Sequence, residues 1–302
     1  MSDFEYKYKT LSVKHLPELQ EDIDKLRREG KLSDNEIYRS YIDTKKFEVP
    51  ENFPNAKSII ILAIFTKLGL VNFHQNGKTH ELMIAPQYFN DGLTQEGIYN
   101  VVIDDIIKEP GYKTELATKL HLKLTAVRSG LGKYGRNNVC YVDEMGSLIT
   151  LLAYFTDYKF EEDNWTEIQM MDYCNNCTIC LNNCPTSAIS STPEENFVIN
   201  AGRCITLYNE IEGDFPDWIP SDAHNALKGC MRCQLPCPGN REAIKRPERL
   251  EDITEEETRM ILEGNVDQNL LYSLSDKIRM FSHTKAEKAF PSFKRNLEVL
   301  LN

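Results

Sequence analysis

Eight of the nine cysteines of the chain lie in one segment, residues 174–237, and their spacing is that of iron–sulfur ligands. The first four form the run Cys174-x2-Cys177-x2-Cys180-x3-Cys184, and a proline follows. In bacterial ferredoxins with this spacing, three thiolates of one loop bind one 4Fe–4S cluster and the fourth thiolate binds a second cluster. The run therefore predicts two clusters and an electron-transfer function.

The remaining ligands are divided along the sequence. The segment GCMRCQLPCPGN supplies three cysteines before its second proline, and Cys204 lies upstream in GRCITLYNE. All eight cysteines are then used. The spacing rule assigns one cluster to Cys174, Cys177, Cys180 and Cys237, and the other to Cys184, Cys204, Cys230 and Cys233.

Two other uses of these cysteines stay open. Structural zinc prefers paired C-x2-C hooks with four ligands for each ion, and the first run sets three sulfurs on one loop instead. Disulfides are uncommon in a reducing compartment. The ninth cysteine, Cys140, lies in RNNVCYVD on an expected strand, where a small buried residue is the better interpretation than a ligand or a nucleophile.

Composition and charge describe an ordinary globular chain with an acidic surface. Its 302 residues are 41% hydrophobic and 27% charged, with a formal net charge of −11. Such a field repels phosphate backbones, so a tRNA partner is disfavoured. The N-terminal sequence has no signal-peptide core, and the longest apolar run, residues 59–65, is too short to span a bilayer. We expect a cytoplasmic protein that does not enter a membrane.

The elements that must position the cysteines alternate between helix and strand. Residues 53–66 predict a buried strand, residues 68–95 look irregular, and strands are expected at 138–143 and 147–156. The first fifty residues predict helices, with a stop at Gly30 and a restart at Ser33 and Asp34. Further helices are expected over 96–109, 113–130, 254–265, 268–281 and 291–302, and Thr254 with Glu257 has capping-box spacing.

These elements predict an α+β fold in three parts. Residues 1–165 form an α/β domain, residues 166–245 form a ferredoxin-like domain with two clusters, and residues 246–302 form a helical tail that packs on the core.

The order of these motifs resembles the iron–sulfur module of epoxyqueuosine reductases. CNNCTICLNNCPTSAI, GRCITLYNE and GCMRCQLPCPGNR follow that family's order and spacing, and RSGLGKYGRNNVCYVDEMGSLITLLAYFTD is similar to its R-x-G-L-G-x-x-G-[KR]-N segment. The related reductive dehalogenases share the arrangement. The resemblance implies a nitroreductase-like N-terminal domain that holds a cobalamin, and two clusters that deliver electrons to its cobalt.

The glycine loop between residues 128 and 136 is the part of this domain that the resemblance links to the cofactor. By itself, Ser129-Gly130 reads as an ordinary helix C-cap. Its glycines also permit sharp bends and a close approach, and its cations could hold an anion. With the resemblance, six residues are candidates for cobalamin contact: Arg128, Gly130, Gly132, Lys133, Gly135 and Arg136.

The proton donor of that family cannot be carried over to this chain. The family has a catalytic Asp before the glycine loop, whereas this sequence has no Asp between Asp105 and Asp143. The local alternatives are better explained as helix-surface residues or, for the histidine, as a packed side chain. They are Glu109, Tyr112, Glu115 and His121.

Two functions follow as hypotheses. The first is an iron–sulfur reductase that takes electrons from an external low-potential donor, passes them through two clusters to a cobalamin, and reduces a small-molecule or protein substrate. The second is an electron-transfer protein that donates to a partner, such as a corrinoid protein, and has no catalytic pocket of its own.

Overall fold

The apolar run of the sequence is a buried strand, as predicted, and it is one of the two inner strands of a four-stranded sheet. In the computed structural model, β2 (Ser58–Phe65) is buried at every position. It pairs antiparallel with β1 (Tyr6–Ser12) on one side and β8 (Ile149–Thr156) on the other, so that Ile61 lies opposite both Lys9 and Ala153. A short edge strand, β5 (Thr114–Leu116), completes the order β1-β2-β8-β5.

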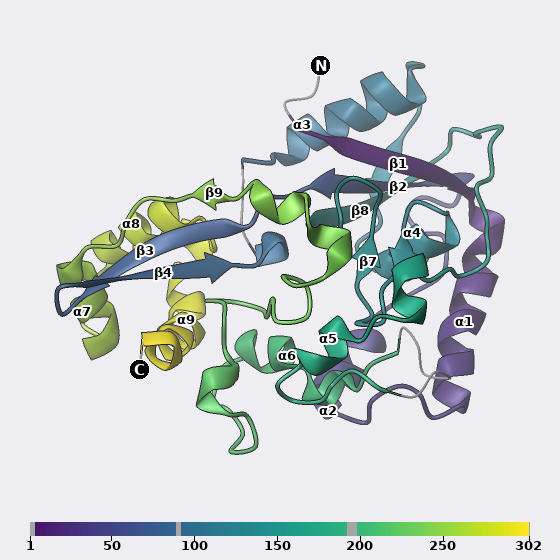
Figure 1. Cartoon of the computed structure of the whole chain (residues 1–302). Coiled ribbons are helices and arrows are strands. Elements are labelled where there is room, and N and C mark those ends of the chain that lie inside the picture. The colour runs from purple at the N-terminus through teal and green to yellow at the C-terminus, as the bar shows by residue number, and fades with distance from the viewer. Residues whose placement is uncertain (1–3, 89–91, 192–197, 302) are drawn as a thin grey trace. The chain divides into compact units, whose positions relative to one another are not determined.

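The chain is divided into two units, and each is assembled from separate stretches of sequence (Figure 1). The first unit comprises Met1–Phe65, Gly92–Cys177 and Ile189–Ala201, and the second comprises Thr66–Asp91, Thr178–Ala188 and Gly202–Asn302. The structure describes residues 4–88, 92–191 and 198–301. The domain boundaries predicted from the sequence follow motifs instead, and they stay a prediction.

Helices cover the sheet of the first unit. Alternate side chains of β2, Ile60, Leu62 and Ile64, pack with Val102 and Ile106 in one buried cluster. Those last two residues belong to a π-helical turn, Val101–Ile107, that continues α3 (Gln95–Asn100), so the helix predicted over 96–109 is confirmed. The alternation of β2 thus places one face of the strand against this helix.

The predicted helical start of the chain is confirmed in part. Helix α1 (Leu16–Arg28) ends before Gly30, and α2 (Glu36–Ile42) follows. The cap of α2 is Asn35, whose side chain accepts hydrogen bonds from two backbone N–H groups, so the predicted restart at Ser33 and Asp34 lies one to two residues too early. Strand β1 precedes both helices and was not predicted.

The helix predicted over 113–130 is correct only in its second half. Residues Thr114–Leu116 form β5, because they pair with the free edge of β8. Helix α4 (Leu122–Arg128) then begins after His121. The apolar residues of this stretch have helical spacing, but pairing with β8 makes the first part a strand. The strand predicted over 147–156 is confirmed, and of that over 138–143 only β7 (Cys140–Tyr141) is a strand.

The stretch predicted to be irregular, residues 68–95, contains a β-hairpin. Strands β3 (Gly69–Gln75) and β4 (Lys78–Ile84) pair antiparallel from end to end, and β9 (Glu248–Arg249) adds to β3 in parallel. The two residues between the hairpin strands, Asn76 and Gly77, have φ of 51° and 70°. Asn-Gly is the strongest short sequence signal for such a turn, so this hairpin could have been predicted.

Three helices pack on this hairpin in the second unit: α7 (Glu255–Glu263), α8 (Gln268–Ile278) and α9 (Ala286–Leu301). The predicted capping box of α7 is present, since Thr254 and Glu257 exchange hydrogen bonds between side chain and backbone. Phe73 of β3 and Phe293 of α9 are 0% and 1% exposed and lie in the same core. Helix α9 begins five residues before the predicted start at Pro291, which lies inside it.

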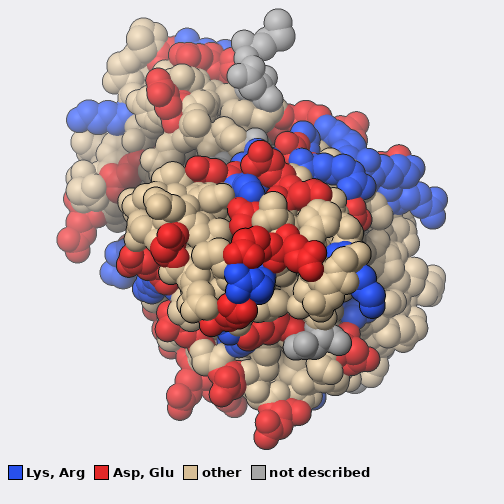
Figure 2. Space-filling view, turned by 90° about the vertical axis from the view of Figure 1, so that its left-hand side faces the viewer, with Lys and Arg blue, Asp and Glu red and all other residues tan. Residues whose placement is uncertain are grey.

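Charged side chains of both signs cover the surface. On the face drawn in Figure 2, Asp and Glu spread across the centre, while Lys and Arg gather mostly towards one edge. On α7, Arg259 binds Glu256 at 2.6 Å and Glu263 at 2.8 Å.

None of the helices in the described ranges is both long and apolar enough to cross a bilayer.

We expect Gly77→Ala to lower the free energy of unfolding by about 1 kcal/mol, because a Cβ disfavours the left-handed conformation that the turn requires. Anaerobic guanidinium unfolding followed by circular dichroism measures the change. Asn76→Gly is the matched control, because glycine adopts positive φ freely. Equal stability of Gly77→Ala and the parent protein would contradict the two-residue turn.

Candidate metal centre and the loop beside it

The glycine loop begins as the end of α4. Gly130 has φ of 69°, its N–H donates to Val127 O at 3.0 Å, and the N–H of Leu131 donates to Ala126 O at 3.0 Å. This is a helix C-terminus closed by a left-handed glycine. Gly130 therefore has the capping function that the sequence suggested without the family resemblance.

Gly132 and Gly135 are required by close packing within the loop. A Cβ on Gly132 would lie 2.6 Å from Cys140 Sγ and 2.8 Å from Tyr141 O. A Cβ on Gly135 would lie 2.5 Å from Asn137 Oδ1 and 2.6 Å from the Tyr141 ring. Both glycines let β6 (Lys133–Tyr134) approach β7 closely enough to pair with it. A side chain at either glycine would clash with β7 or with Asn137, so both glycines are explained by packing within the protein.

The backbone N–H groups of the loop also donate within the protein. Gly132 donates to Ala126 O at 3.3 Å, Gly135 to Val139 O at 2.9 Å, and Tyr134 to Gln169 O at 2.9 Å. A loop that cradles an anion presents its N–H groups outward. The N–H groups of this loop are already engaged in protein hydrogen bonds, so they do not fit such a cradle for a cofactor.

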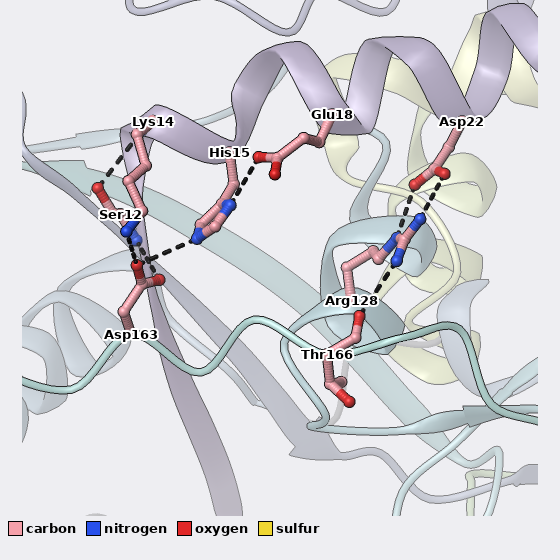
Figure 3. Close-up of polar contacts among 8 residues, drawn as sticks. All are labelled: Ser12, Lys14, His15, Glu18, Asp22, Arg128, Asp163 and Thr166. Carbon is pink, nitrogen blue, oxygen red and sulfur yellow. Dashed lines mark hydrogen bonds and ion pairs between the residues drawn. The ribbon is translucent and has the colours of Figure 1, made fainter.

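Arg128 is held by acidic side chains of the first unit (Figure 3). Its guanidinium donates to both carboxylate oxygens of Asp22 on α1, at 2.6 and 2.7 Å, and to Glu167 at 3.2 Å. It also lies over the Trp165 ring, 4.9 Å from the centroid. The hydrogen bond that Arg128 donates to Asp22 raises the pKa of Arg128 above its usual range. Its charge is therefore used to join α4 to α1.

His15 links the start of α1 to the segment at residues 163–167, and no sequence signal predicted this link. Its Nδ1 lies 2.6 Å from Glu18 and its Nε2 lies 3.0 Å from Asp163 (Figure 3). The imidazole stacks on Trp165 with the ring centroids 4.3 Å apart. Asp163 also accepts from the N–H of Ser12. The segment at residues 163–167 is thereby fixed to the start of α1.

That fixed segment leads to the first two cysteines, and the glycine loop pairs with it. Met171 donates its N–H to Tyr134 O at 2.9 Å, and Cys174 donates to Met171 O at 2.9 Å. A 3₁₀ turn, Asp172–Asn175, then places the Cys174 thiol in a buried position. The glycine loop therefore supports the backbone that carries the cysteines.

Arg136 makes the closest contacts between the glycine loop and these cysteines. Its N–H donates to Cys174 Sγ at 3.4 Å, and its side chain donates to Cys174 O at 2.8 Å and Cys177 O at 3.2 Å. Arg136 is 8% exposed. Lys133 is the one cation of the loop that is half exposed, with Asp172 4.0 Å away. The six candidate residues thus lie together, and most of their groups bind within the chain.

The second unit gathers three cysteines that the spacing rule assigned to one cluster. Cys184 Sγ accepts from the N–H of Ala188 at 3.3 Å. Burial raises the pKa of Cys230 to about 12, and the neighbouring Cys204 and Cys184 thiols add to the shift. A buried thiol among other thiols becomes a thiolate readily only when a metal binds it. This donor set fits an iron–sulfur cluster.

Arginines also fix the cysteine segments of the second unit. Arg203, which precedes Cys204, donates to Thr186 O at 3.2 Å and lies over the Trp218 ring at 4.2 Å. This bond ties the turn after Cys184 to the segment of Cys204. Arg232, between Cys230 and Cys233, donates to carbonyl oxygens of Asp222, Ala223 and His224.

The ligands predicted for the first cluster are divided between the two units in sequence. The first ligand set, Cys174, Cys177, Cys180 and Cys237, draws from both units, and it stays a prediction. Over the described ranges, no three His, Cys, Asp or Glu side chains surround a point closely enough to hold one metal ion. A cubane distributes its thiolates over four irons, so this observation does not test the clusters.

Cys140 is a buried core residue, as predicted. It is 2% exposed, and burial raises the pKa of its thiol to about 12. Its sulfur packs against Gly132.

The four proton-donor candidates have structural contacts. Glu109 accepts from Tyr158 at 3.2 Å, Tyr112 packs edge-on against the same ring, and Glu115 accepts from Asn52 at 2.8 Å. The Nδ1 of His121 accepts from the N–H of Leu124 and caps α4. Burial, with nearby Lys123 and Lys45, lowers the pKa of His121 to about 3, so its ring is neutral.

One acidic group that the sequence did not single out lies in the second unit. Tyr88 donates its hydroxyl to Glu210, and burial raises the pKa of that carboxyl. Lys228 lies 5.7 Å from the Tyr88 ring centroid, and a Cβ on Gly229 would meet the ring at 2.6 Å. This pair therefore packs against the residue that precedes Cys230.

Comparison with known proteins supports the two-cluster interpretation. Residues 173–240 match the family described as a 4Fe-4S double cluster binding domain. The chain is 34% identical over 119 residues to the epoxyqueuosine reductase of Staphylococcus aureus, covering 39% of this chain and 29% of that one. It is 27% identical over 216 residues to that of Atelocyanobacterium thalassa, covering 67% and 64%. The chain thus spans less than two thirds of these relatives.

Solved structures of epoxyqueuosine reductases share the fold of this chain. The epoxyqueuosine reductase of Streptococcus thermophilus aligns over 98% of this chain and 76% of its own, with a TM-score of 0.67 at 21% identity. A structure of epoxyqueuosine reductase with a modified tRNA stem loop aligns over 99% and 77%, with a TM-score of 0.66 at 20% identity. The mixed α/β fold predicted from the sequence is confirmed at this level.

The packing around Gly132 can be tested directly. We expect Gly132→Ala to lower the free energy of unfolding by about 2 kcal/mol, because its Cβ overpacks against Cys140 and the Tyr141 carbonyl. Anaerobic denaturant unfolding without any added cofactor measures this. Gly130→Asn is the control, because asparagine tolerates positive φ and the space there is open to 3.4 Å. A stable Gly132→Ala variant with impaired corrinoid binding would instead support the predicted cofactor contact.

Proposed function

We propose that this chain, which is a divergent relative of the epoxyqueuosine reductases, is an iron–sulfur oxidoreductase that relays electrons through two 4Fe–4S clusters. The family resemblance predicted from its motifs is confirmed by the relatives it matches. The proposal rests on one observation above the others: all eight cysteines between residues 174 and 237 lie within the matched double-cluster domain, residues 173–240. The Cys184 and Cys204 thiols both raise the pKa of Cys230, which supports the assignment of these three residues to one ligand set.

The clusters suit a one-electron relay from an external low-potential donor. The first cluster takes Cys174, Cys177, Cys180 and Cys237, and the second takes Cys184, Cys204, Cys230 and Cys233. Hydrogen bonds to the sulfurs and exposure to solvent set the potential of each cluster, so the arginines beside the cysteines bear on the direction of electron flow.

A cobalamin in a nitroreductase-like N-terminal domain is the electron acceptor that the family resemblance implies. When bound, it supplies a strongly reducing metal centre that side chains cannot provide. The glycine loop fits this group poorly, because Arg128 is bound to Asp22 and the loop N–H groups donate within the protein. We therefore propose that a corrinoid, where it binds, is held mainly by groups other than residues 128–136.

The similarity to epoxyqueuosine reductases and the net charge of the chain favour different substrates. A solved relative holds an epoxyqueuosine-modified tRNA stem loop, which makes tRNA the first substrate to test. The net charge of −11 opposes phosphate backbones and favours a small-molecule or protein substrate.

Electron transfer to a partner protein is the second candidate function. Two observations favour it: the inward bonding of the glycine loop, and the absence of Asp between Asp105 and Asp143. Such a protein would have no corrinoid of its own and would reduce a partner with basic side chains around its docking site. Acidic side chains on this chain would accelerate that encounter at low salt.

Single Cys→Ser variants test the ligand sets. Anaerobically reconstituted protein should hold two 4Fe–4S clusters by iron, sulfide and EPR analysis. We expect Cys204→Ser to lose the second cluster and Cys177→Ser the first, because each removes one of four thiolates. Cys140→Ala is the matched control and should keep both clusters, since Cys140 packs in the core. Tightly bound zinc, or loss of the same cluster in both Ser variants, would refute the assignment.

Binding experiments separate the two functions. A reductase of the proposed kind should bind added cobalamin and give a base-off spectrum. The electron-transfer alternative predicts reducible clusters with no corrinoid bound. Titration with an unmodified tRNA anticodon stem loop at 50 and 200 mM salt tests the substrate. Saturable binding that survives the higher salt supports tRNA, and its absence at both concentrations argues against recognition of the tRNA backbone.

A further inference from the structure

Arg136 is a cation of the glycine loop that the structure places on the cysteine segment. We propose that Arg136 is a positioning residue that fixes the Cys174–Cys177 turn and raises the reduction potential of the cluster bound there. The inference rests on the proposed two-cluster function. It gives a different function to a residue that the family resemblance linked to a cobalamin.

The contacts of Arg136 span the first C-x2-C turn. The guanidinium donates to the carbonyl of Cys174 at 2.8 Å and to that of Cys177 at 3.2 Å, and the backbone N–H donates to Cys174 Sγ at 3.4 Å. One residue therefore bonds to both ends of the turn and to one sulfur. All of these atoms belong to the first unit.

The planar fork of the guanidinium suits this function. Two N–H groups that point in fixed directions can hold two carbonyl oxygens at a set separation. A lysine would bring the same charge as a point without fixing that separation. The two carbonyls belong to the ligands themselves, so their separation controls where both thiolates lie. Arg136 therefore prepares the turn for metal before iron arrives.

The charge of Arg136 acts on the cluster as well as on the backbone. The residue is 8% exposed, so solvent screens its charge weakly. A cluster gains one negative charge when it accepts an electron. A buried positive charge beside it stabilises the reduced form more than the oxidised form, and this raises the potential. The N–H bond to Cys174 Sγ acts in the same direction.

The effect should be specific to one cluster. Arg203 and Arg232 are neighbours of second-cluster cysteines in sequence, and they donate to carbonyl oxygens within the second unit, at Thr186 and at residues 222–224. The Arg136 contacts described above bind Cys174 and Cys177 of the first unit. Removing Arg136 should therefore leave the second cluster unchanged.

The test is an EPR-monitored redox titration of anaerobically reconstituted full-length protein. Arg136→Met removes the charge and the fork, and Arg136→Lys restores the charge alone. Lys57→Met is the matched control, because it removes an exposed cation of the same unit. Each variant is also made together with Cys204→Ser, so that the first cluster is observed alone. Iron and sulfide content reports how completely each cluster forms.

We expect a more negative midpoint for the first cluster of Arg136→Met. The ratio of reduced to oxidised cluster at a fixed potential should fall roughly tenfold, which is about 59 mV for a one-electron couple. Arg136→Lys should stay near the parent potential with the first cluster incompletely formed. Lys57→Met should change neither cluster.

Three results would overturn the inference: a first cluster of unchanged potential and content in Arg136→Met, equal shifts in both clusters, or the same shift in Lys57→Met. If Arg136→Met takes up no first cluster, Arg136→Lys decides. A first cluster that forms in the Lys variant supports the inference, and one that is absent from it as well overturns the charge effect. A parent protein without clusters would refute the proposed function itself, which is a different outcome.

Discussion

A short cysteine turn can bind iron only if its backbone is held open against its own flexibility, and the hydrogen bonds of the glycine loop impose that constraint. Tyr134 pairs with the segment that enters the turn, and Arg136 binds the turn itself. The loop is held in turn by α4, whose Arg128 is bound to Asp22 of α1. The sheet and helices of the first unit therefore serve to keep a few carbonyl oxygens and one sulfur in place.

The sequence predicted the features that depend on neighbouring residues. The buried strand β2 and the capping box at Thr254 were read from residues within a few positions of one another, and both agree with the structure. The ligand sets read from the cysteine spacing stay a prediction. The hairpin at Asn76-Gly77 has an equally local signal, and it was missed because its strands are only partly buried and carry mixed polarity. The Asn-Gly signal was present in the sequence, but the stretch around it was interpreted as irregular.

Other features depend on partners far along the chain. Strand β5 forms because the edge of β8 is available, and nothing in Thr114–Leu116 announces it. His15 meets Asp163 across 148 positions. The positive charges of the glycine loop could bind a ligand or the protein, and only the coordinates show that Arg128 and Arg136 turn inward. Local patterns cannot decide between two partners of the same chemistry.

The overall charge and the charge near the cysteines have opposite signs. The chain carries −11, and acidic side chains are widespread on its surface. Beside the cysteines, Arg136, Arg203 and Arg232 each bind main-chain carbonyls. A net charge computed from composition therefore describes encounters with partners but not the environment in which electrons reside. The two properties can change independently in related chains.

The division of the chain into interleaved stretches has a consequence for its biogenesis. Phe73 reaches its final packing only with Phe293, so β3 leaves the ribosome long before its core exists. The C-x2-C-x2-C run is itself one of the places where the chain passes from one unit to the other, between Cys177 and Thr178. Cys180 and the later cysteines belong to the second unit, so their thiols lie on an incomplete core until translation has passed residue 293. A cell that makes this protein must protect those thiols during synthesis and deliver iron after it.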